Sequence, residues 1–113
     1  MRLISWNMHG ANGSIKAHER AWEWLTLHSD ADICLLQEVI PNEEHLRSWS
    51  SYVFSAKRKQ PRWGTMILVR EGQLQKFAPT LDTPWLKRFE SSAPVARHDE
   101  FGLILCSVHS SYS

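Results

Sequence analysis

The sequence lacks an apolar run long enough to cross a membrane, and its N-terminus lacks the pattern of a secretory signal peptide. A membrane-spanning helix needs about 20 consecutive apolar residues. Residues 1–7 contain one charged side chain and only a brief apolar stretch. We therefore expect a soluble, cytoplasmic protein that does not insert into membranes.

Cysteine is also scarce, with two residues in a chain of 113. Cys34 lies in the apolar run 33–36 and Cys106 in the apolar run 103–106. Each is predicted to be a small buried hydrophobic residue rather than half of a disulfide, which fits a reducing compartment. The histidines show no zinc-site spacing, and the cysteines are too isolated to suggest zinc, so a structural zinc site is not expected.

The chain has almost no net charge, with a formal value of +1. A net charge this small gives no long-range electrostatic field that would attract nucleic acid or an anionic membrane. The net charge therefore does not indicate which class of partner the protein binds. Repeats, low-complexity tracts and linkers are also missing, and a hydrophobic content of 42% is that of a globular chain. We expect one domain, residues 1–113, with one core.

The first forty residues have the pattern of a βαβ unit. The apolar run 3–6 ends at Asn7, before the loop signature 10–13, and a second, continuous apolar run covers 33–37. Between them, Ser14 is a suitable N-cap for an amphipathic helix whose apolar stripe contains Ile15, His18, Ala21, Trp22 and Leu25. Strands in such a unit run parallel, so Asn7 and Glu38 are predicted to lie at the same edge of a sheet.

The rest of the chain is predicted to be a short helix followed by strands. Asn42 would cap a helix over 43–49, with Leu46 and Trp49 facing inward. Strands are predicted over 51–56, 63–70 and 73–77, and a closing hairpin over 94–97 and 101–108. The predicted fold class is α/β, with a mixed sheet and outer helices. Among the tryptophans, Trp22, Trp24 and Trp49 are predicted to serve packing.

Asn7 and Glu38 are the first candidate site residues. An Asn after an apolar run is most often a turn former, and a Glu at a strand end is most often a solvated carboxylate. Together, at adjacent strand ends, the amide and the carboxylate would form an oxygen-rich pocket of the kind that Mg²⁺ or Mn²⁺ prefers.

His109 is the third candidate. It follows the run 101–108, whose alternation would place it at the end of a strand and on the same face as Ser107. The alternative is a hydrogen-bonded core histidine. Phosphodiester hydrolysis needs a donor to the leaving oxygen, and an imidazole is suited to that role.

Four segments, in order, resemble the endonuclease/exonuclease/phosphatase family. Residues 3–10 are similar to its opening strand, 30–39 to the strand with its metal-binding Glu, 63–68 to its Gly-led central strand, and 105–110 to the strand that delivers the active-site His. The resemblance implies the N-terminal half of a two-sheet α/β sandwich of the deoxyribonuclease I-like type. It also implies that Asn7 orients the metal-bound phosphate, Glu38 binds Mg²⁺ or Mn²⁺, and His109 protonates or stabilises the leaving oxygen.

The later motifs of that family, Gly-Asp-Xaa-Asn and Ser-Asp-His, do not occur in this sequence. Three hypotheses follow. The first is a metal-dependent phosphoesterase, nuclease-like, acting on a phosphate ester such as nucleic acid. The second is a truncated half-domain without independent activity, whose partner is a missing C-terminal half. The third is a small nucleic-acid-binding module that uses the basic run 57–62 and Trp63, although this run fits a solvated loop better.

Overall fold

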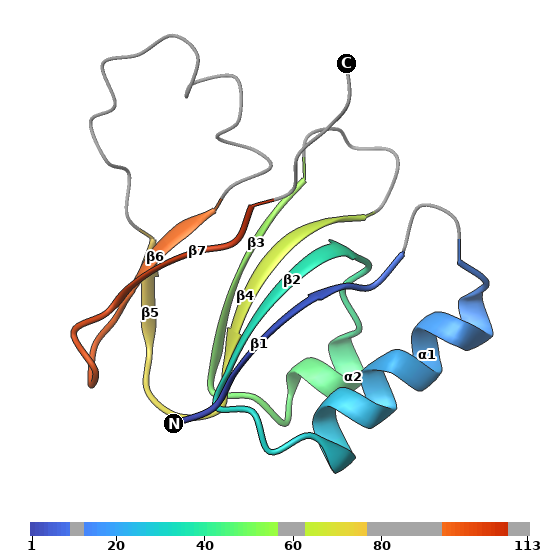
Figure 1. Cartoon of the computed structure of the whole chain (residues 1–113), viewed down its shortest axis with the longest axis horizontal. Helices are drawn as coiled ribbons and strands as arrows, with labels where there is room; N and C mark the ends of the chain where they lie inside the picture. The colour runs from blue at the N-terminus through green and yellow to red at the C-terminus, as the bar shows by residue number, and fades with distance from the viewer. Residues whose placement is uncertain (10–12, 57–62, 77–93, 109–113) are drawn as a thin grey trace, which may run out of the picture.

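Two β-sheets and a helical layer make up the described structure, a computed structural model that covers residues 1–9, 13–56, 63–76 and 94–108 (Figure 1). The elements in chain order are β1 (Leu3–Asn7), α1 (Ile15–Glu23), η1 (Trp24–His28), β2 (Ile33–Val39), α2 (Glu43–Leu46), β3 (Ser51–Ser55), β4 (Gly64–Val69), β5 (Leu74–Lys76), β6 (Val95–His98) and β7 (Ile104–Cys106). The segment η1 is a π-helical continuation of α1. None of the described helices is both long enough and apolar enough to cross a membrane.

The first sheet has the strand order β1-β2-β4-β3 and is mixed. β1 and β2 run parallel, whereas β4 is antiparallel to both of its neighbours, β2 and β3. The second sheet, β5-β6-β7, is entirely antiparallel. The parallel pair predicted for the N-terminal βαβ unit and the hairpin predicted near the end of the chain are both confirmed.

The first sheet is covered on both faces. One face packs on the helices through a core that includes Trp22, Leu36 and Met66. The other face packs on the second sheet through a core that includes Ile67 and Leu105. The order of layers is therefore helices, first sheet, second sheet, as Figure 1 shows. This explains why β2 is an almost continuous apolar run, because a strand covered on both faces has no solvent side. The predicted α/β class with a mixed sheet and outer helices is confirmed at this level.

The predicted start of the first helix is confirmed, but two residues that were predicted to face the core from this helix are exposed. Ser14 caps α1, with its hydroxyl oxygen accepting a hydrogen bond from the Ala17 N–H at 3.1 Å. Ile15, however, is 77% exposed, because the buried part of the apolar stripe begins one turn later, at His18. Trp24 is also not a core residue: it is 47% exposed and lies edge-on against Trp6. The spacing of apolar residues indicates which face of the helix points toward the core, but it does not indicate which residues on that face contact the sheet.

The second helix begins at Glu43 as predicted but ends at Leu46 rather than at residue 49. Asn42 caps α2, and its side-chain oxygen accepts a hydrogen bond from the His45 N–H at 3.1 Å. Leu46 and Trp49 are both buried in the helix-side core, as predicted.

Arg70 closes the C-terminal end of the first helical segment. Its guanidinium donates hydrogen bonds to the carbonyl oxygens of Ala31 (2.9 Å), Ser29 (3.0 Å), Leu25 (3.2 Å) and Thr26 (3.4 Å). It also lies 4.2 Å from the ring centroid of Trp49. Helix ends leave carbonyl groups without intrahelical partners, and a cation is favourable at that end of the helix dipole. Arg70 thus joins the end of β4 to the helical layer.

The two cysteines differ in environment, so the prediction that both are buried is wrong for one of them. Cys34 is buried in the helix-side core, whereas Cys106 is exposed on β7. β7 is an edge strand of the second sheet, and alternation buries its neighbour Leu105 instead. Both thiols are free, as predicted.

Alkylation with iodoacetamide should distinguish the two thiols. Burial raises the pKa of the Cys34 thiol to about 12, and the thiolate is the reactive form. Burial also raises the pKa of Cys106, which is nevertheless exposed to reagent. We expect mass spectrometry of the native protein to show Cys106 modified well before Cys34, and both modified at similar rates in denaturant. Equal rates in the native protein would contradict the buried position of Cys34.

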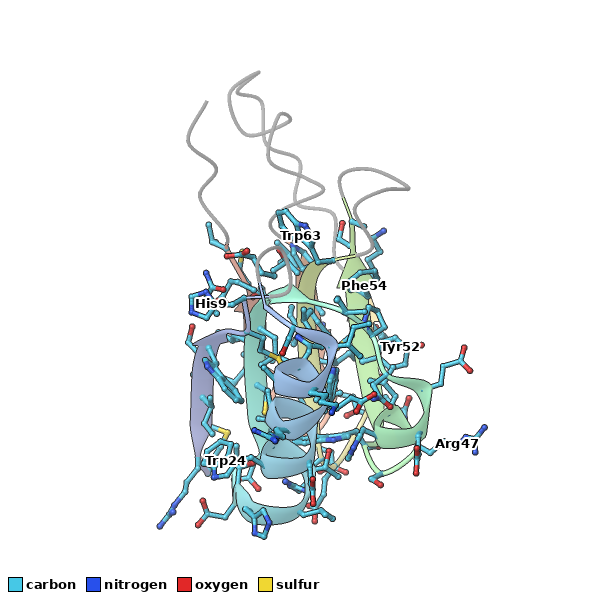
Figure 2. The ribbon with its side chains drawn as sticks, turned by 90° about the vertical axis from the view of Figure 1, so that its right-hand side faces the viewer. His9, Trp24, Arg47, Tyr52, Phe54 and Trp63 are labelled. Carbon is cyan, nitrogen blue, oxygen red and sulfur yellow. The ribbon has the colours of Figure 1, made fainter. Side chains whose placement is uncertain are left out.

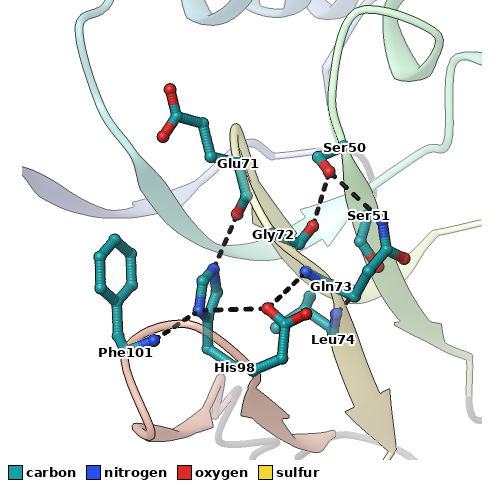
Figure 3. Close-up of polar contacts among 9 residues, drawn as sticks. Ser50, Ser51, Glu71, Gly72, Gln73, Leu74, His98 and Phe101 are labelled. Atoms are coloured by element: carbon teal, nitrogen blue, oxygen red, sulfur yellow. Dashed lines mark hydrogen bonds and ion pairs between the residues drawn. The ribbon is translucent and has the colours of Figure 1, made fainter.

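A polar network joins the β4–β5 turn to the β6–β7 turn (Figure 3). His98 is fully buried; its Nε2 lies 2.7 Å from the carbonyl oxygen of Glu71, and its Nδ1 accepts a hydrogen bond from the Phe101 N–H at 3.2 Å. Asp99 accepts a hydrogen bond from the Gln73 N–H at 2.8 Å. Gly72 has a φ of +80° and leaves no space for a Cβ beside the His98 ring. This network holds the second sheet to the end of the first sheet where β4 finishes.

Asp99 should make the stability of the protein sensitive to acid. The hydrogen bond from the Gln73 N–H holds the pKa of the Asp99 carboxyl below its usual value. A group with a lowered folded pKa stabilises the fold above its unfolded pKa, and that contribution is lost as the pH falls through the folded pKa. We expect Asp99→Asn to be less stable than wild type at pH 7 in urea unfolding, with the difference shrinking below about pH 4. A difference that does not change with pH would contradict this role.

Candidate functional site

The ends of β1 and β2 meet at one edge of the first sheet. In the parallel register Asn7 pairs with Gln37, so Glu38 is the next residue along β2. The Met8 N–H then donates to the Gln37 carbonyl oxygen at 2.8 Å and extends the pairing past Asn7. The two candidate residues predicted to share this edge therefore come from neighbouring strand ends, as Figure 1 shows for the strands. Ligands of open α/β sheets usually bind beyond the carboxyl ends of parallel strands.

Asn7 shapes the turn that follows β1. Its side-chain oxygen accepts a hydrogen bond from the His9 N–H at 3.0 Å, and His9 has a φ of +55°. This is the turn-forming role that Asn most often has. An amide oxygen has two lone pairs, so this bond leaves the oxygen the capacity for a second interaction.

Glu38 lies in a β-bulge with an unusual backbone conformation. Leu36 pairs with Met66 and Val39 pairs with Gly64, so two residues of β2, Gln37 and Glu38, face one residue of β4. The φ of Glu38 is +49°, and among the described residues only His9 and Glu38 have a positive φ without being glycine. Bulges are frequent beside active sites, and strained non-glycine residues cluster at functional sites. Both residues lie at this edge.

Gly64, the first residue of β4, pairs with Val39, the residue that follows the bulge. A Cβ at this position would overlap the carbonyl oxygen of Ser55 and would lie 2.8 Å from the Phe54 ring. Only glycine lets β4 begin this close to β3. The glycine at the start of the central strand, one of the features on which the family resemblance was based, therefore has a steric reason here.

A buried polar pair, which the sequence analysis missed, links the two sheets at the same end. The Gln37 side-chain amide donates to the Ser107 hydroxyl oxygen at 3.0 Å, and the Ser107 hydroxyl donates to the Leu36 carbonyl oxygen at 3.2 Å. Ser107 is fully buried. The one available signal was a Gln at the end of an apolar strand. His109 lies outside the described residues, and in the sequence it follows Ser107 by two positions.

The face predicted for the run 101–108 is only partly confirmed. Leu105 and Ser107 are buried, but Phe101 and Leu103 are exposed, since β7 begins at Ile104 and the residues before it belong to the turn after β6.

The segment that follows Glu38 is held by α1. His18 Nε2 accepts a hydrogen bond from the Ile40 N–H at 2.9 Å, and Trp22 Nε1 donates to the Ile40 carbonyl oxygen at 2.9 Å. His18 and Trp22 were both placed on the buried stripe of the helix by the sequence pattern. Their polar contact with the chain after β2 was not predicted, because it depends on how the helix lies against the sheet.

The donor groups at this edge suit a hard cation. Asn7 supplies an amide oxygen and Glu38 a carboxylate, and Mg²⁺ is commonly held by one or two carboxylates with water and substrate phosphate completing its shell. Within the described ranges, no three His, Cys, Asp or Glu side chains gather as a metal cluster. Asn7 and Glu38 are therefore the candidate ligands for a cation at this edge among the described residues.

Aromatic side chains lie toward the same end of the molecule. Figure 2 shows His9, Phe54 and Trp63 on this side and Trp24 and Arg47 on the opposite side. His9 is exposed, and Phe54 and Trp63 are half-buried. The basic run 57–62, on which the nucleic-acid-binding hypothesis depends, lies outside the described residues.

No model of a known protein family matches this sequence, and no curated protein matches it.

Proposed function

We propose that this chain is a metal-dependent, nuclease-like phosphoesterase of the endonuclease/exonuclease/phosphatase type that hydrolyses a phosphodiester or phosphomonoester. The observation that carries the proposal is the position of Asn7 and Glu38 at adjacent ends of a parallel strand pair, with Glu38 in a strained bulge. The finer fold assignment, half of a deoxyribonuclease I-like sandwich, belongs to the same proposal. The layer order of helices, mixed sheet and second sheet supports it.

Each residue has a distinct role in this proposal. Glu38 holds Mg²⁺ or Mn²⁺ through its carboxylate, and Asn7 orients the phosphate beside it. The bound cation would polarise the phosphoryl oxygens and lower the pKa of a water molecule. His109 donates a proton to the leaving oxygen. This role of His109 rests on the sequence resemblance, because His109 lies outside the described residues.

Glu38→Gln should weaken Mn²⁺ binding by at least about tenfold, because the amide keeps the size of the side chain but removes the charge that a hard cation needs. Isothermal titration calorimetry of the wild type and the variant would measure this. Glu71→Gln is the matched control, since Glu71 is an exposed carboxylate at the opposite end of β4 and should leave the affinity unchanged. Equal Mn²⁺ affinity in wild type and Glu38→Gln would contradict the role of Glu38.

Hydrolysis is tested separately from binding, with bis(p-nitrophenyl) phosphate as a generic diester. Metal-dependent release of p-nitrophenol that Glu38→Gln abolishes supports the phosphoesterase. Mn²⁺ binding through Glu38 without turnover supports the half-domain hypothesis, because catalytic residues that act as a unit lose most of their effect when some are missing. Salt-dependent binding of single-stranded DNA that survives both EDTA and Glu38→Gln supports the binding module.

A further inference from the structure

We infer that His18 and Trp22 are positioning residues that keep Glu38 in its strained conformation by holding the peptide groups of Ile40. The structural part of this inference concerns the backbone at Glu38, and its consequence for metal binding rests on the proposed function.

The side chains of His18 and Trp22, both on α1, form hydrogen bonds to the backbone of the same residue, Ile40. His18 and Trp22 are four positions apart on α1, so they lie on the same face of the helix. One accepts the N–H of Ile40 and the other donates to its carbonyl oxygen, each at 2.9 Å. Both are buried, so water competes little for these bonds. The peptide planes on both sides of Ile40 are thereby fixed relative to α1.

Glu38 is held from both directions. Before it, Gln37 is bound through its carbonyl oxygen to the Met8 N–H and through its side chain to Ser107. After it, Ile40 is bound to His18 and Trp22. A non-glycine residue in the left-handed region is unfavourable and persists only where the surroundings over-determine it. These attachments on either side supply that constraint.

His18 also carries an unsatisfied polar atom that packing alone does not explain. Its Nε2 lies 2.9 Å from the Ile40 nitrogen and 3.2 Å from the Ile40 carbonyl oxygen; we assign the shorter contact as the hydrogen bond, with Nε2 accepting, and this assignment puts the ring proton on Nδ1. That Nδ1 is buried without a hydrogen-bond partner, and it is the one such side-chain atom in the part of the chain that the structure describes. A leucine would fill a similar volume without this penalty. What histidine provides at position 18, and leucine would not, is the Nε2 acceptor for the Ile40 N–H.

A double-mutant cycle between positions 18 and 38 tests the inference without any metal. Glu38→Ala and Glu38→Gly both remove the carboxylate, but only glycine tolerates a positive φ without strain. His18→Leu should lower the folding equilibrium constant at least about twofold less in the alanine background than in the glycine background, because loss of the contact to Ile40 lets the strained alanine backbone relax whereas glycine has no strain to relieve. Leu25→Val, in the same helix, is the control and should have equal effects in both. Equal effects of His18→Leu in the two backgrounds would overturn the inference.

Trp22→Phe provides a second route if His18→Leu does not fold. It keeps an aromatic ring in the core and removes only the indole N–H, and it should show the same difference between the two backgrounds. Additive behaviour of this variant would also count against a role in holding Ile40.

The consequence for the site is measured as Mn²⁺ affinity in variants that keep Glu38. His18→Leu should weaken binding about 10- to 100-fold, as is usual when a residue that orients a ligand is lost. His18→Gln retains an acceptor for the Ile40 N–H and should recover part of the affinity. Unchanged affinity in folded His18→Leu, beside a loss in Glu38→Gln, would overturn the link to the site. If the wild-type protein binds no Mn²⁺, the proposed function is wrong. The double-mutant cycle between positions 18 and 38 still tests whether the hydrogen bonds to Ile40 hold Glu38 in its conformation.

Discussion

Replacement of Arg70 by alanine is expected to lower the free energy of unfolding by about 2–4 kcal/mol. The guanidinium donates hydrogen bonds to four carbonyl oxygens, at the end of the first helical segment and in the stretch that follows it, and lies over the Trp49 ring. Alanine removes all of these contacts together, so part-buried carbonyl oxygens lose a donor, although that of Leu25 keeps the Ser29 hydroxyl. A domain is stable by only about 5–15 kcal/mol, so the loss is a large fraction of the total. Urea unfolding followed by tryptophan fluorescence would measure it.

Two further variants show whether geometry or charge matters at position 70. Arg70→Lys keeps the charge but lacks the planar fork of donors, so it should recover less than half of the loss. Arg47→Ala removes an arginine that is exposed at the end of α2 and points away from the body of the molecule in Figure 2. Its effect should stay within about 0.5 kcal/mol. An Arg70→Ala protein as stable as Arg47→Ala would show that the carbonyl contacts contribute nothing.

Gly64→Ala is expected to cost about 2–3 kcal/mol, because overfilling a packed site forces neighbouring groups to move. The new methyl group would overlap the carbonyl oxygen of Ser55, a backbone atom of β3 that cannot rotate away. β3 and β4 must separate to accept it. Gly64 also pairs with Val39, the residue after Glu38, so the displacement should reach the candidate site and weaken Mn²⁺ binding as well.

Gly102→Ala is the matched control for this prediction. Gly102 has a φ of +62°, and nothing lies within 4 Å of the position that a Cβ would occupy. Alanine there meets only the conformational cost of a positive φ, about 1 kcal/mol. Unfolding free energies for the two variants would separate steric overlap from backbone strain. A smaller loss for Gly64→Ala than for Gly102→Ala would contradict the close approach of β3 and β4.

Local patterns predicted the elements of this fold because each pattern has a local cause. The caps Ser14 and Asn42 were recognisable because a short polar side chain that satisfies a free N–H is a property of a few adjacent residues. The strand β2 was recognisable from a continuous apolar run. Burial was predicted less well: Ile15, Trp24 and Cys106 are exposed, because burial depends on where other elements end.

Some features of the candidate site could likewise be predicted from local patterns, and others could not. The common edge of Asn7 and Glu38 was predictable, since it follows from the parallel geometry of a βαβ unit. The bulge at Glu38 was not, because a register shift depends on how β2 pairs with β4, its partner strand in the sheet. The hydrogen bond between Gln37 and Ser107 joins residues 70 positions apart, a separation over which no short sequence pattern extends. His109 stays a prediction.

The sequence by itself determined the order and approximate positions of the strands and helices, where the helices begin, and that an amide and a carboxylate would end neighbouring strands. These features depend on interactions over a few residues or on the limited ways in which βαβ units connect. Only the tertiary structure decided that Glu38 takes a left-handed conformation and that α1 holds the chain after it through Ile40. A strained residue is kept in place by elements that are distant in sequence, and those elements meet only when the layers pack.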